Sequence, residues 1–374
     1  MKKIGVLTSS RADYGIYYPL LYDLRDHPEF DLKIIAFGTH LSPYHGFTVN
    51  QIEEDGFKVE FKINSLLLND DENSLATGAA LTALKFSDFW NINRDEFDLV
   101  FCLGDRFEMF GAVSSGIPYG VNFAHIHAGE TTLGAIDNVY RHAITLASRM
   151  YFTSTEMYRK RVKAIIGSDK GIVLSGALAL DNIGKVVLYT PVQFKDIYKI
   201  DLNTPAILMT VHPETVSPKN NYKHLNVLEE FIKYVITKAQ IVITMPNADT
   251  MGSLFRELYQ KLENQYPDRI KIIENFGTKG YFTCLKHCKM VVGNSSSGII
   301  EAASFGKYVI NIGDRQKGRF TGDNVKHVPF NIEKMKKAFG DFWQSDQYDG
   351  LNPYYHGGAT KKILFELKKY FNFT

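Results

Sequence analysis

The sequence has few cysteines, little net charge and no long apolar run. Its 374 residues include three cysteines, an odd number that is too small for a disulfide framework. Forty-three Lys and Arg residues against 41 Asp and Glu give a net charge of +2, so no overall field attracts nucleic acid or an anionic membrane. No run reaches the roughly 18 apolar residues of a transmembrane helix. An anionic ligand would therefore have to be held by a local site.

The first residues also lack the pattern of an export signal. A short apolar run at 4–7 follows Lys2 and Lys3, and it is broken at once by polar residues at 8–11 and 13. This run is much shorter than the hydrophobic segment of a secretory signal. Together with the scarcity of cysteine, this pattern predicts a cytoplasmic protein.

Apolar material, in contrast, is plentiful. Hydrophobic residues make up 45% of the chain and aromatic residues 13%, which is enough for full cores. At about 150 residues per domain, the length predicts two domains. Short apolar runs alternate with helical stretches, which is typical of βαβ units around a parallel sheet. The sequence therefore predicts an α/β fold.

The strand pattern runs through the first half of the chain and then restarts. In the first half we predict strands at 3–8, 32–37, 99–103, 119–125, 150–153 and 171–174. In the second half we predict them at 206–211, 240–245, 270–274, 290–292 and 308–311. Such a restart indicates two doubly wound units, which bind ligands outside the carboxyl ends of their strands. We expect the two units to face each other across a cleft.

The connection between the units is predicted at 181–205, which has no clean period and carries Pro191 and Pro205. Placing the boundary near Thr190 gives domains 1–189 and 190–374. The last segment, 361–370, has the pattern of an amphipathic helix and is expected to pack on the body of the protein, where a return to the first domain is one arrangement.

Two loops of the first half place charged residues after strands. The first strand runs into TSSRADYG, where free amides at a helix start favour an anion and Arg11 adds a positive charge; an ordinary helix cap is the alternative. The block GDRFE follows the strand at 99–103 and offers Asp105 and Arg106. A surface ion pair is the alternative for these two residues; the functional hypothesis places Asp105 in the cleft and Arg106 near a phosphate.

The densest cluster of reactive side chains is HIHAGE, followed by GAIDN and RHAIT. His125 and His127 occupy alternate positions of a predicted strand and would face the same way, as in the beginning of a metal site. No further His or Cys stands at ligand spacing. Glu130 and Asp137, with Asp105, could supply the proton donors and acceptors that C–H abstraction requires.

The second half carries the strongest anion signal. GNSSSG lies between a strand and a helix and offers backbone amides, hydroxyls and a helix N-terminus, which together favour phosphate. Glu301, about one turn later, could accept hydrogen bonds from a ribose diol. The blocks HPET and PNADT follow two other strands, and GDRQKGR adds three cations, for which a solvated basic loop is the alternative.

The ordered blocks TSSRADYG, LGDRFE, HIHAGE with GAIDN and RHAIT, HPET, PNADT, GNSSSGIIE and INIGDRQKGR resemble the hydrolysing UDP-N-acetylglucosamine 2-epimerases, the NeuC type of bacterial sialic acid pathways. The resemblance spans nearly the whole chain. The related LegG enzymes act on nucleotide-linked N,N'-diacetylbacillosamine and share the blocks. The resemblance implies a GT-B fold, a UDP-sugar substrate, no cofactor and no metal, and a homodimer or homotetramer.

The resemblance also implies site residues, position by position. Those implied for nucleotide binding are Arg11, Gly15, Arg106, His212, Asn247, Ser295, Ser296, Glu301 and Arg315, with Phe276 near the place of a uracil-stacking residue. Asp105 and Asp137 match two of the family's catalytic acids, and His212 is expected to stabilise the departing diphosphate. Many relatives have Glu where this chain has His127. Either Glu130 or His127 fills that third position, and we expect Glu130 to do so.

The implied reaction is anti elimination of UDP with loss of the C2 proton, followed by hydration of the resulting 2-acetamidoglucal to the free 2-epimeric sugar. No nicotinamide is required for it, and GxGxxG is absent from the sequence. Three other functions stay open: a GT-B glycosyltransferase, a metal-dependent hydrolase built on His125 and His127, and a non-catalytic sugar-nucleotide sensor.

Overall fold

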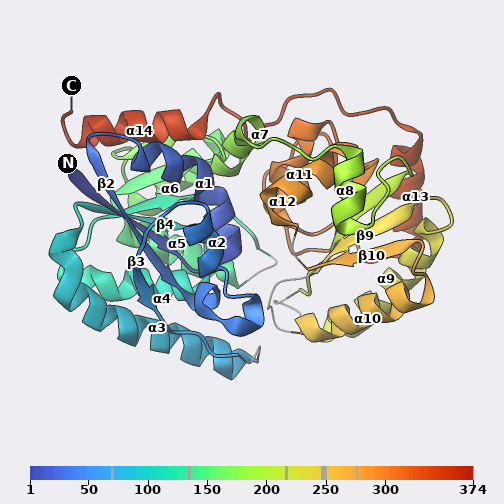
Figure 1. The fold of residues 1–374 in the computed structure, drawn as a ribbon, viewed down its shortest axis with the longest axis horizontal. Coiled ribbons are helices and arrows are strands. Elements are labelled where there is room, and N and C mark those ends of the chain that lie inside the picture. The colour runs from blue at the N-terminus through green and yellow to red at the C-terminus, as the bar shows by residue number, and fades with distance from the viewer. Residues whose placement is uncertain (69–70, 134–135, 215–217, 246–250, 275, 374) are drawn as a thin grey trace. The chain divides into compact units, whose positions relative to one another are not determined.

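The computed structural model describes residues 1–68, 71–133, 136–214, 218–245, 251–274 and 276–373 (Figure 1). They form two compact units, each with its own parallel sheet. The first contains Met1–Glu130, Asp137–Lys185 and Tyr354–Thr374, and the second contains Thr131–Ile136 and Val186–Pro353. The predicted α/β class is confirmed. The units change at 185/186 and not at 189/190, and the chain also crosses between them at 130/131, 136/137 and 353/354.

The first unit has a seven-stranded parallel sheet in the order β3-β2-β1-β4-β5-β6-β7. Its strands are β1 (Lys2–Thr8), β2 (Phe30–Phe37), β3 (Val59–Ile63), β4 (Leu99–Leu103), β5 (Phe123–Ile126), β6 (Met150–Thr153) and β7 (Ile172–Leu174). Its helices are α1 (Arg11–Arg25), α2 (Val49–Glu54), α3 (Glu72–Asn93), α4 (Phe107–Gly116), α5 (Asp137–Ala147), α6 (Glu156–Ile166), α7 (Asn182–Lys185) and α14 (Ala359–Tyr370).

Central strand β4 shows why this sequence forms a covered parallel sheet. All five of its residues are buried, and they alternate between two cores. Phe101 packs with side chains of α1 and α14, whereas Val100 packs with side chains of α3, α4 and α5. A continuous apolar run of this length suits a strand that is covered on both faces.

The second unit has a six-stranded parallel sheet in the order β10-β9-β8-β11-β12-β13. Its strands are β8 (Ala206–Thr210), β9 (Gln240–Thr244), β10 (Ile270–Ile273), β11 (Met290–Gly293), β12 (Val309–Ile312) and β13 (Val325–Val328). Its helices are α8 (Pro191–Tyr198), α9 (Asn221–Val235), α10 (Gly252–Gln265), α11 (Gly277–His287), α12 (Ser296–Ile300) and α13 (Ile332–Gln344).

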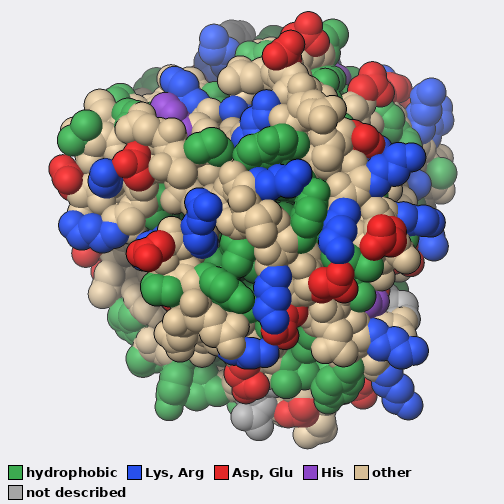
Figure 2. Space-filling view, turned by 90° about the vertical axis from the view of Figure 1, so that its right-hand side faces the viewer, with side chains coloured by type: hydrophobic (Ala, Val, Ile, Leu, Met, Phe, Trp, Pro, Cys, Tyr) green, Lys and Arg blue, Asp and Glu red, His purple; other side chains and the backbone are tan. Residues whose placement is uncertain are grey.

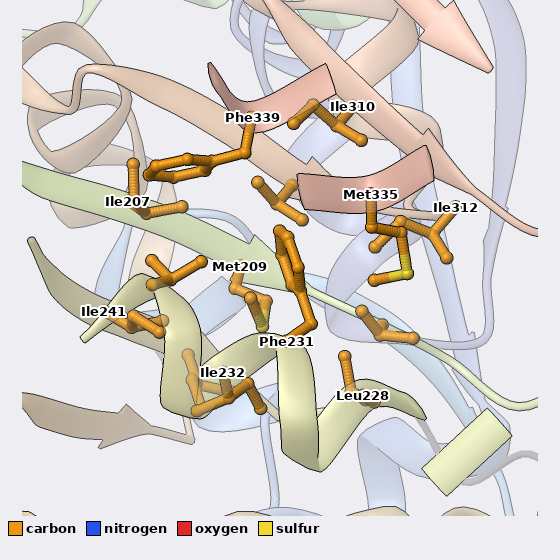
Figure 3. Close-up of a cluster of buried hydrophobic side chains, with 14 of the residues drawn as sticks. Ile207, Met209, Leu228, Phe231, Ile232, Ile241, Ile310, Ile312, Met335 and Phe339 are labelled. Carbon is orange, nitrogen blue, oxygen red and sulfur yellow. The ribbon is translucent and has the colours of Figure 1, made fainter. Parts of the chain in front are cut away.

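Side chains of the central strand β8 of this unit also pack into two cores. Ile207 and Met209 pack against α9 and α13, where Phe231 and Phe339 close one face of the sheet (Figure 3). Leu208 points to the other face, into a core shared with α8 and α11. At β11 the chain passes so close to β8 that a Cβ on Gly293 would lie 1.9 Å from the Thr210 carbonyl oxygen. Only glycine fits there, at a φ of 145°.

The edges of the sheets differ from the prediction. Strands β3 and β13 were not predicted, because both are edge strands with mixed polar and apolar residues. Strand β5 begins at Phe123, since residues 117–119 form a 3-10 turn. The stretch 181–205, predicted to be irregular, contains α8, whose two turns are too short to show a period. Helix α8 starts with a capping box between Thr190 and Gln193 and with Pro191 in its first turn.

Charges of both signs are interspersed on the face shown in Figure 2, in keeping with the small net charge. Among the described residues, no helix is long and apolar enough to cross a membrane.

The last helix, α14, returns to the first unit and covers its core with Ile363 and Leu367 (Figure 1). Its start is held by Asp181, whose carboxylate accepts hydrogen bonds from the amides of Ala359 (3.0 Å) and Thr360 (2.7 Å). Both amides belong to the first turn of the helix, where no intrahelical acceptor is available.

We therefore expect Asp181→Ala to destabilise the attachment of α14 by about 1 kcal/mol, the usual effect of losing a capping side chain. Hydrogen exchange of the amides of α14 would measure the change. Asp169→Ala, which removes an exposed carboxylate paired with Lys163 at 2.8 Å, is the control and should leave the exchange of α14 unchanged. Equal protection of α14 in all three proteins would contradict the capping role.

Candidate active site

The first part of the site lies at the carboxyl ends of three neighbouring strands of the first unit. Strands β1, β4 and β5 are adjacent in the sheet, and the loops that follow them carry the predicted residues. These loops are 9–13, 104–106 and 127–130. Parallel strands bring their carboxyl ends to one edge, so loops that are far apart in the sequence meet there.

The side chain that joins two of these loops is Arg141 of α5. Its guanidinium forms an ion pair with the Asp105 carboxylate and donates a hydrogen bond to the carbonyl oxygen of His127 at 2.9 Å. The Arg141 side chain is only 4% exposed, so its charge needs both acceptors. The planar guanidinium can donate in two directions at once, which fixes Asp105 relative to His127.

His127 stands just beyond the end of β5 in the left-handed backbone region, with φ 63°. Its Nδ1 lies 2.7 Å from Oε1 of Glu130, and the Ser154 hydroxyl donates to the same oxygen at 2.6 Å. Glu130 is 1% exposed. Since a carboxylate oxygen is the acceptor in both contacts, the tautomer with the proton on Nδ1 satisfies them and has its lone pair on Nε2.

His125 has an internal structural role. Its Nε2 donates to the Gly104 carbonyl oxygen at 2.8 Å, and its Nδ1 contacts the Thr145 hydroxyl at 3.1 Å. Burial lowers the pKa of His125 to about 3, so the ring is neutral. The expectation that His125 and His127 face the same way was wrong, because the strand ends between them. No described group of three or more His, Cys, Asp or Glu side chains could hold a metal ion.

Arg106 is held by the carboxylate of Glu108. Its Nε and Nη2 lie 3.1 and 2.9 Å from the two oxygens of Glu108, a buried residue. In the first loop, Asp13 accepts hydrogen bonds from the amide and hydroxyl of Ser9. Burial raises the pKa of Asp13, while the Ser9 hydroxyl and the positive charge of Arg106 oppose that shift. The two loops are thus electrostatically coupled.

The remaining predicted residues of this unit lie on helices. Arg11 is exposed in the first turn of α1, and Gly15 lies one turn later, with its carbonyl oxygen accepting from Asn182 at 2.8 Å. Asp137 is the first residue of α5. It precedes Arg141 by four residues and therefore lies on the same side of the helix.

The second unit has its own group of candidate residues, built around Asn294. Strands β8, β11 and β12 are neighbours, and Asn294 follows β11. Its side chain accepts from the amide of His212 at 2.7 Å and donates to the carbonyl oxygen of His212 at 2.8 Å. Its own carbonyl oxygen accepts from Gln316 at 2.8 Å and Arg315 at 3.2 Å. One buried residue therefore joins the loops after all three strands.

The GNSSSG loop places Ser295 at the N-cap of α12 and Ser296 at its first position. Ser297 donates to the carboxylate of Glu301 and also contacts the Tyr281 hydroxyl. Burial raises the pKa of Glu301 to about 7, with the Ser297 hydroxyl opposing the shift. Glu301 therefore changes its charge near neutral pH.

The basic loop after β12 is held in place by Glu214 of the HPET block. One oxygen of Glu214 accepts from the amide of Asp314 at 2.6 Å. The loop lines a pocket of about 370 Å³ in the second unit, to which Lys317, Arg319 and His327 contribute positive or titratable groups. The predicted alternative of a solvated loop does not describe Arg319, which is 9% exposed.

Two further residues were predicted to bind the nucleotide, Phe276 and Asn247. Phe276 is 7% exposed, and its ring packs against Phe194 and Tyr198 in a core of the second unit. Stacking of this ring on uracil therefore stays a prediction, and it would need a part of the ring that the contacts with Phe194 and Tyr198 leave open. Asn247 lies outside the described residues.

The residues that connect the loops were not predicted. Arg141 and Asn294 both fall within quoted blocks, but no role followed from the sequence, and Ser154 lies outside the blocks. Arg141 carried one usable signal, its position four residues after Asp137. The partners of Asn294 lie 82 and 22 residues away, so no local pattern indicates them.

The family model described as UDP-N-acetylglucosamine 2-epimerase matches residues 22–368. A relative from Campylobacter jejuni, named GDP/UDP-N,N'-diacetylbacillosamine 2-epimerase (hydrolyzing), is 34% identical over 90% of this chain and 86% of its own. A relative from Legionella pneumophila, named UDP-N,N'-diacetylbacillosamine 2-epimerase (hydrolyzing), is 34% identical over 99% of this chain and 96% of its own.

Among solved structures, the UDP-GlcNAc 2-epimerase from Neisseria meningitidis bound to UDP-GlcNAc has a TM-score of 0.82. It is 18% identical to this chain and covers 99% of it, with 100% of its own chain matched. This similarity confirms the predicted GT-B class, with two Rossmann-like units in one chain.

The Asn294 contacts generate a stability prediction. Asn294→Ala leaves the buried amide and carbonyl of His212 without their partners, at roughly 1–3 kcal/mol for each group. We expect the second unit to lose about 2–4 kcal/mol of unfolding free energy. Denaturant unfolding followed by hydrogen exchange of β8 and β11 measures this. Asn264→Ala on the exposed surface of α10 is the matched control, and a similar loss in both variants would contradict the role of Asn294.

Proposed function

Because the chain belongs to the UDP-N-acetylglucosamine 2-epimerase family, we propose that it is a hydrolysing 2-epimerase of a nucleotide-linked 2-acetamido sugar. The proposed reaction takes the UDP-sugar and water to UDP and the free 2-epimeric sugar. The observation that carries the proposal is the buried network at the ends of β4 and β5, in which Arg141 joins Asp105 to the His127 loop.

The reaction needs groups that move protons at carbon. Removal of an unactivated C2 proton requires a positioned acceptor, and hydration of the glycal requires a donor on the opposite face. Asp105, His127 and Glu130 lie in one network, and Asp137 starts the helix that carries Arg141. A glycosyltransferase or a sensor has no need for several proton-transfer groups held together in this way.

The reaction also needs a site for the leaving diphosphate. In the second unit, Asn294 joins His212 to Arg315, and the next residues, Ser295 and Ser296, begin α12. Amides, hydroxyls and a guanidinium together stabilise the negative charge that develops on the departing phosphate. Arg11, Gly15 and Arg106 of the first unit remain proposed contacts of the nucleotide.

Two sugars are candidates for the substrate. UDP-N-acetylglucosamine fits the family as a whole, and its product would be N-acetylmannosamine for nonulosonic acid synthesis. A nucleotide-linked N,N'-diacetylbacillosamine is favoured by the printed names of the Campylobacter and Legionella relatives. The two sugars differ at C4 and C6, so discrimination depends on the pocket around those carbons.

The test incubates the protein with each nucleotide sugar in D2O, with and without EDTA, and follows the products by NMR. We expect UDP and a free 2-epimeric sugar with deuterium at C2 from one of the two substrates, unaffected by EDTA. Release of the unepimerised sugar, or no turnover of either substrate, contradicts the proposed reaction. Loss of activity with EDTA supports the metal-dependent alternative.

Asp105→Asn tests the proposed catalytic acid. We expect turnover to fall about 10²- to 10⁴-fold, the usual contribution of a positioned proton-transfer group. The affinity for UDP, measured by calorimetry, should be retained, because most proposed nucleotide contacts lie in the second unit. Asp169→Asn, which changes an exposed carboxylate in the same way, should keep full turnover. Loss of UDP affinity in Asp105→Asn would assign Asp105 to binding.

Glu301 gives a pH prediction. With a pKa of about 7 it is mostly protonated at pH 6 and ionised at pH 8, and only the carboxylate accepts from both hydroxyls of a ribose diol. We expect the affinity for UDP to contain a component that rises between pH 6 and 8. UDP titrates in this range as well, so the measured quantity is the difference between wild type and Glu301→Gln. An identical pH profile for both proteins contradicts the ribose role.

A further inference from the structure

The open choice between Glu130 and His127 can be examined through the atoms that each side chain has available. The oxygen Oε1 of Glu130 already accepts from His127 and from Ser154, and the residue is 1% exposed. A carboxylate used in this way orients its neighbours. This oxygen, which already accepts twice, has little capacity left to take a proton from a sugar carbon.

His127, in contrast, has one ring nitrogen that is hydrogen-bonded to a described residue and one that is not. Its Nδ1 is engaged by Glu130, and its residue is 6% exposed. No described residue lies within hydrogen-bonding distance of its Nε2, although this nitrogen is shielded from solvent. A buried imidazole nitrogen without a partner is costly unless a ligand supplies one.

The backbone at His127 supports the same assignment. A φ of 63° is uncommon for a residue other than glycine, and residues held in that region are frequent at functional sites. The conformation is held by Arg141, which binds the His127 carbonyl oxygen and the Asp105 carboxylate. The backbone of His127 is therefore linked through Arg141 to a proposed catalytic acid, Asp105. Its ring is held separately by Glu130.

We infer that His127 Nε2 is the base that takes the C2 proton of the sugar, and that Glu130 and Ser154 are positioning residues; this inference rests on the proposed 2-epimerase function. The C2–H bond breaks, its proton binds Nε2, and its electron pair forms the C1=C2 double bond. The C1–O bond breaks, and its electron pair leaves on the phosphate oxygen of UDP. In the hydration half, the water oxygen binds C1 and that water loses one proton, while C2 receives a proton on the opposite face. His127 returns its proton to solvent, so that one water is consumed and one proton is released with UDP.

The arrangement compensates the charge that this step creates. Proton uptake converts the neutral ring to an imidazolium whose Nδ1–H lies 2.7 Å from the Glu130 carboxylate. An opposite charge at hydrogen-bond distance stabilises the charged ring and fixes its tautomer. Ser154 holds that carboxylate from a second side, so the base is oriented before substrate binds.

His127→Asn and His127→Gly test the inference, because asparagine and glycine both tolerate the left-handed backbone. The asparagine amide can still donate to Glu130 but cannot accept a proton. We expect both variants to lose about 10²- to 10⁴-fold in kcat, with little change in the affinity for UDP. Nearly full activity in His127→Asn would show that His127 is structural and would overturn the inference.

Added imidazole provides a second readout. It should restore turnover of His127→Gly in proportion to its concentration, and deuterium from D2O should again appear at C2. Asp105→Asn is the matched control, since it should be equally slow and gain nothing from imidazole. A His127→Gly protein that binds UDP normally but does not respond to imidazole, while Glu130→Gln shows the larger loss, would assign the base to Glu130.

The double variant separates the two roles. If Glu130 acts only through the ring, His127→Gly with Glu130→Gln should be about as slow as His127→Gly alone, since residues that act as a unit are not additive. A further large loss would mean that Glu130 acts on the sugar itself. Wild-type turnover with deuterium at C2 is required first; its absence refutes the proposed function, whereas wild-type turnover with an active His127→Asn refutes only this inference.

Discussion

The buried guanidinium of Arg141 is the constraint on which the first part of the site depends. A charge on a side chain that is 4% exposed needs a counter-charge and hydrogen-bond acceptors, and Asp105 and the His127 carbonyl oxygen hold fixed positions around it. These acceptors come from the ends of β4 and β5, which are adjacent in the sheet. The sheet brings the loops near each other, and the ion pair sets the orientation of the proposed catalytic side chains.

In the second unit, an uncharged residue joins the loops at the strand ends. Asn294 is fully buried, and its amide and backbone bind the loops after β8 and β12. A neutral amide suits this place, because the surrounding loops already carry Arg315 and the other cations. In both units, one buried polar residue at a strand end joins loops that the sequence separates by many residues.

The sequence was sufficient for the sheet interiors and for the strand-end loops that carry the candidate residues. Strands such as β4 are continuous apolar runs, and the loops after them carry the polar blocks. Edge strand β3 has no such run, because one side of an edge is open to solvent. The roles of Arg141 and Asn294 depend on contacts across 36 and 82 residues, and the burial of Phe276 depends on α8, a helix that the sequence did not reveal.

If His127 is the base, as inferred, an imidazole in place of a carboxylate has an electrostatic consequence. A nucleotide diphosphate sugar is an anion, and a carboxylate base close to it must be held there against repulsion. A neutral imidazole avoids this repulsion in the ground state and becomes positive as negative charge develops on the leaving phosphate. The buried Glu130 carboxylate, 2.7 Å behind the ring, then has its strongest effect after proton transfer, which is the differential stabilisation that lowers a barrier.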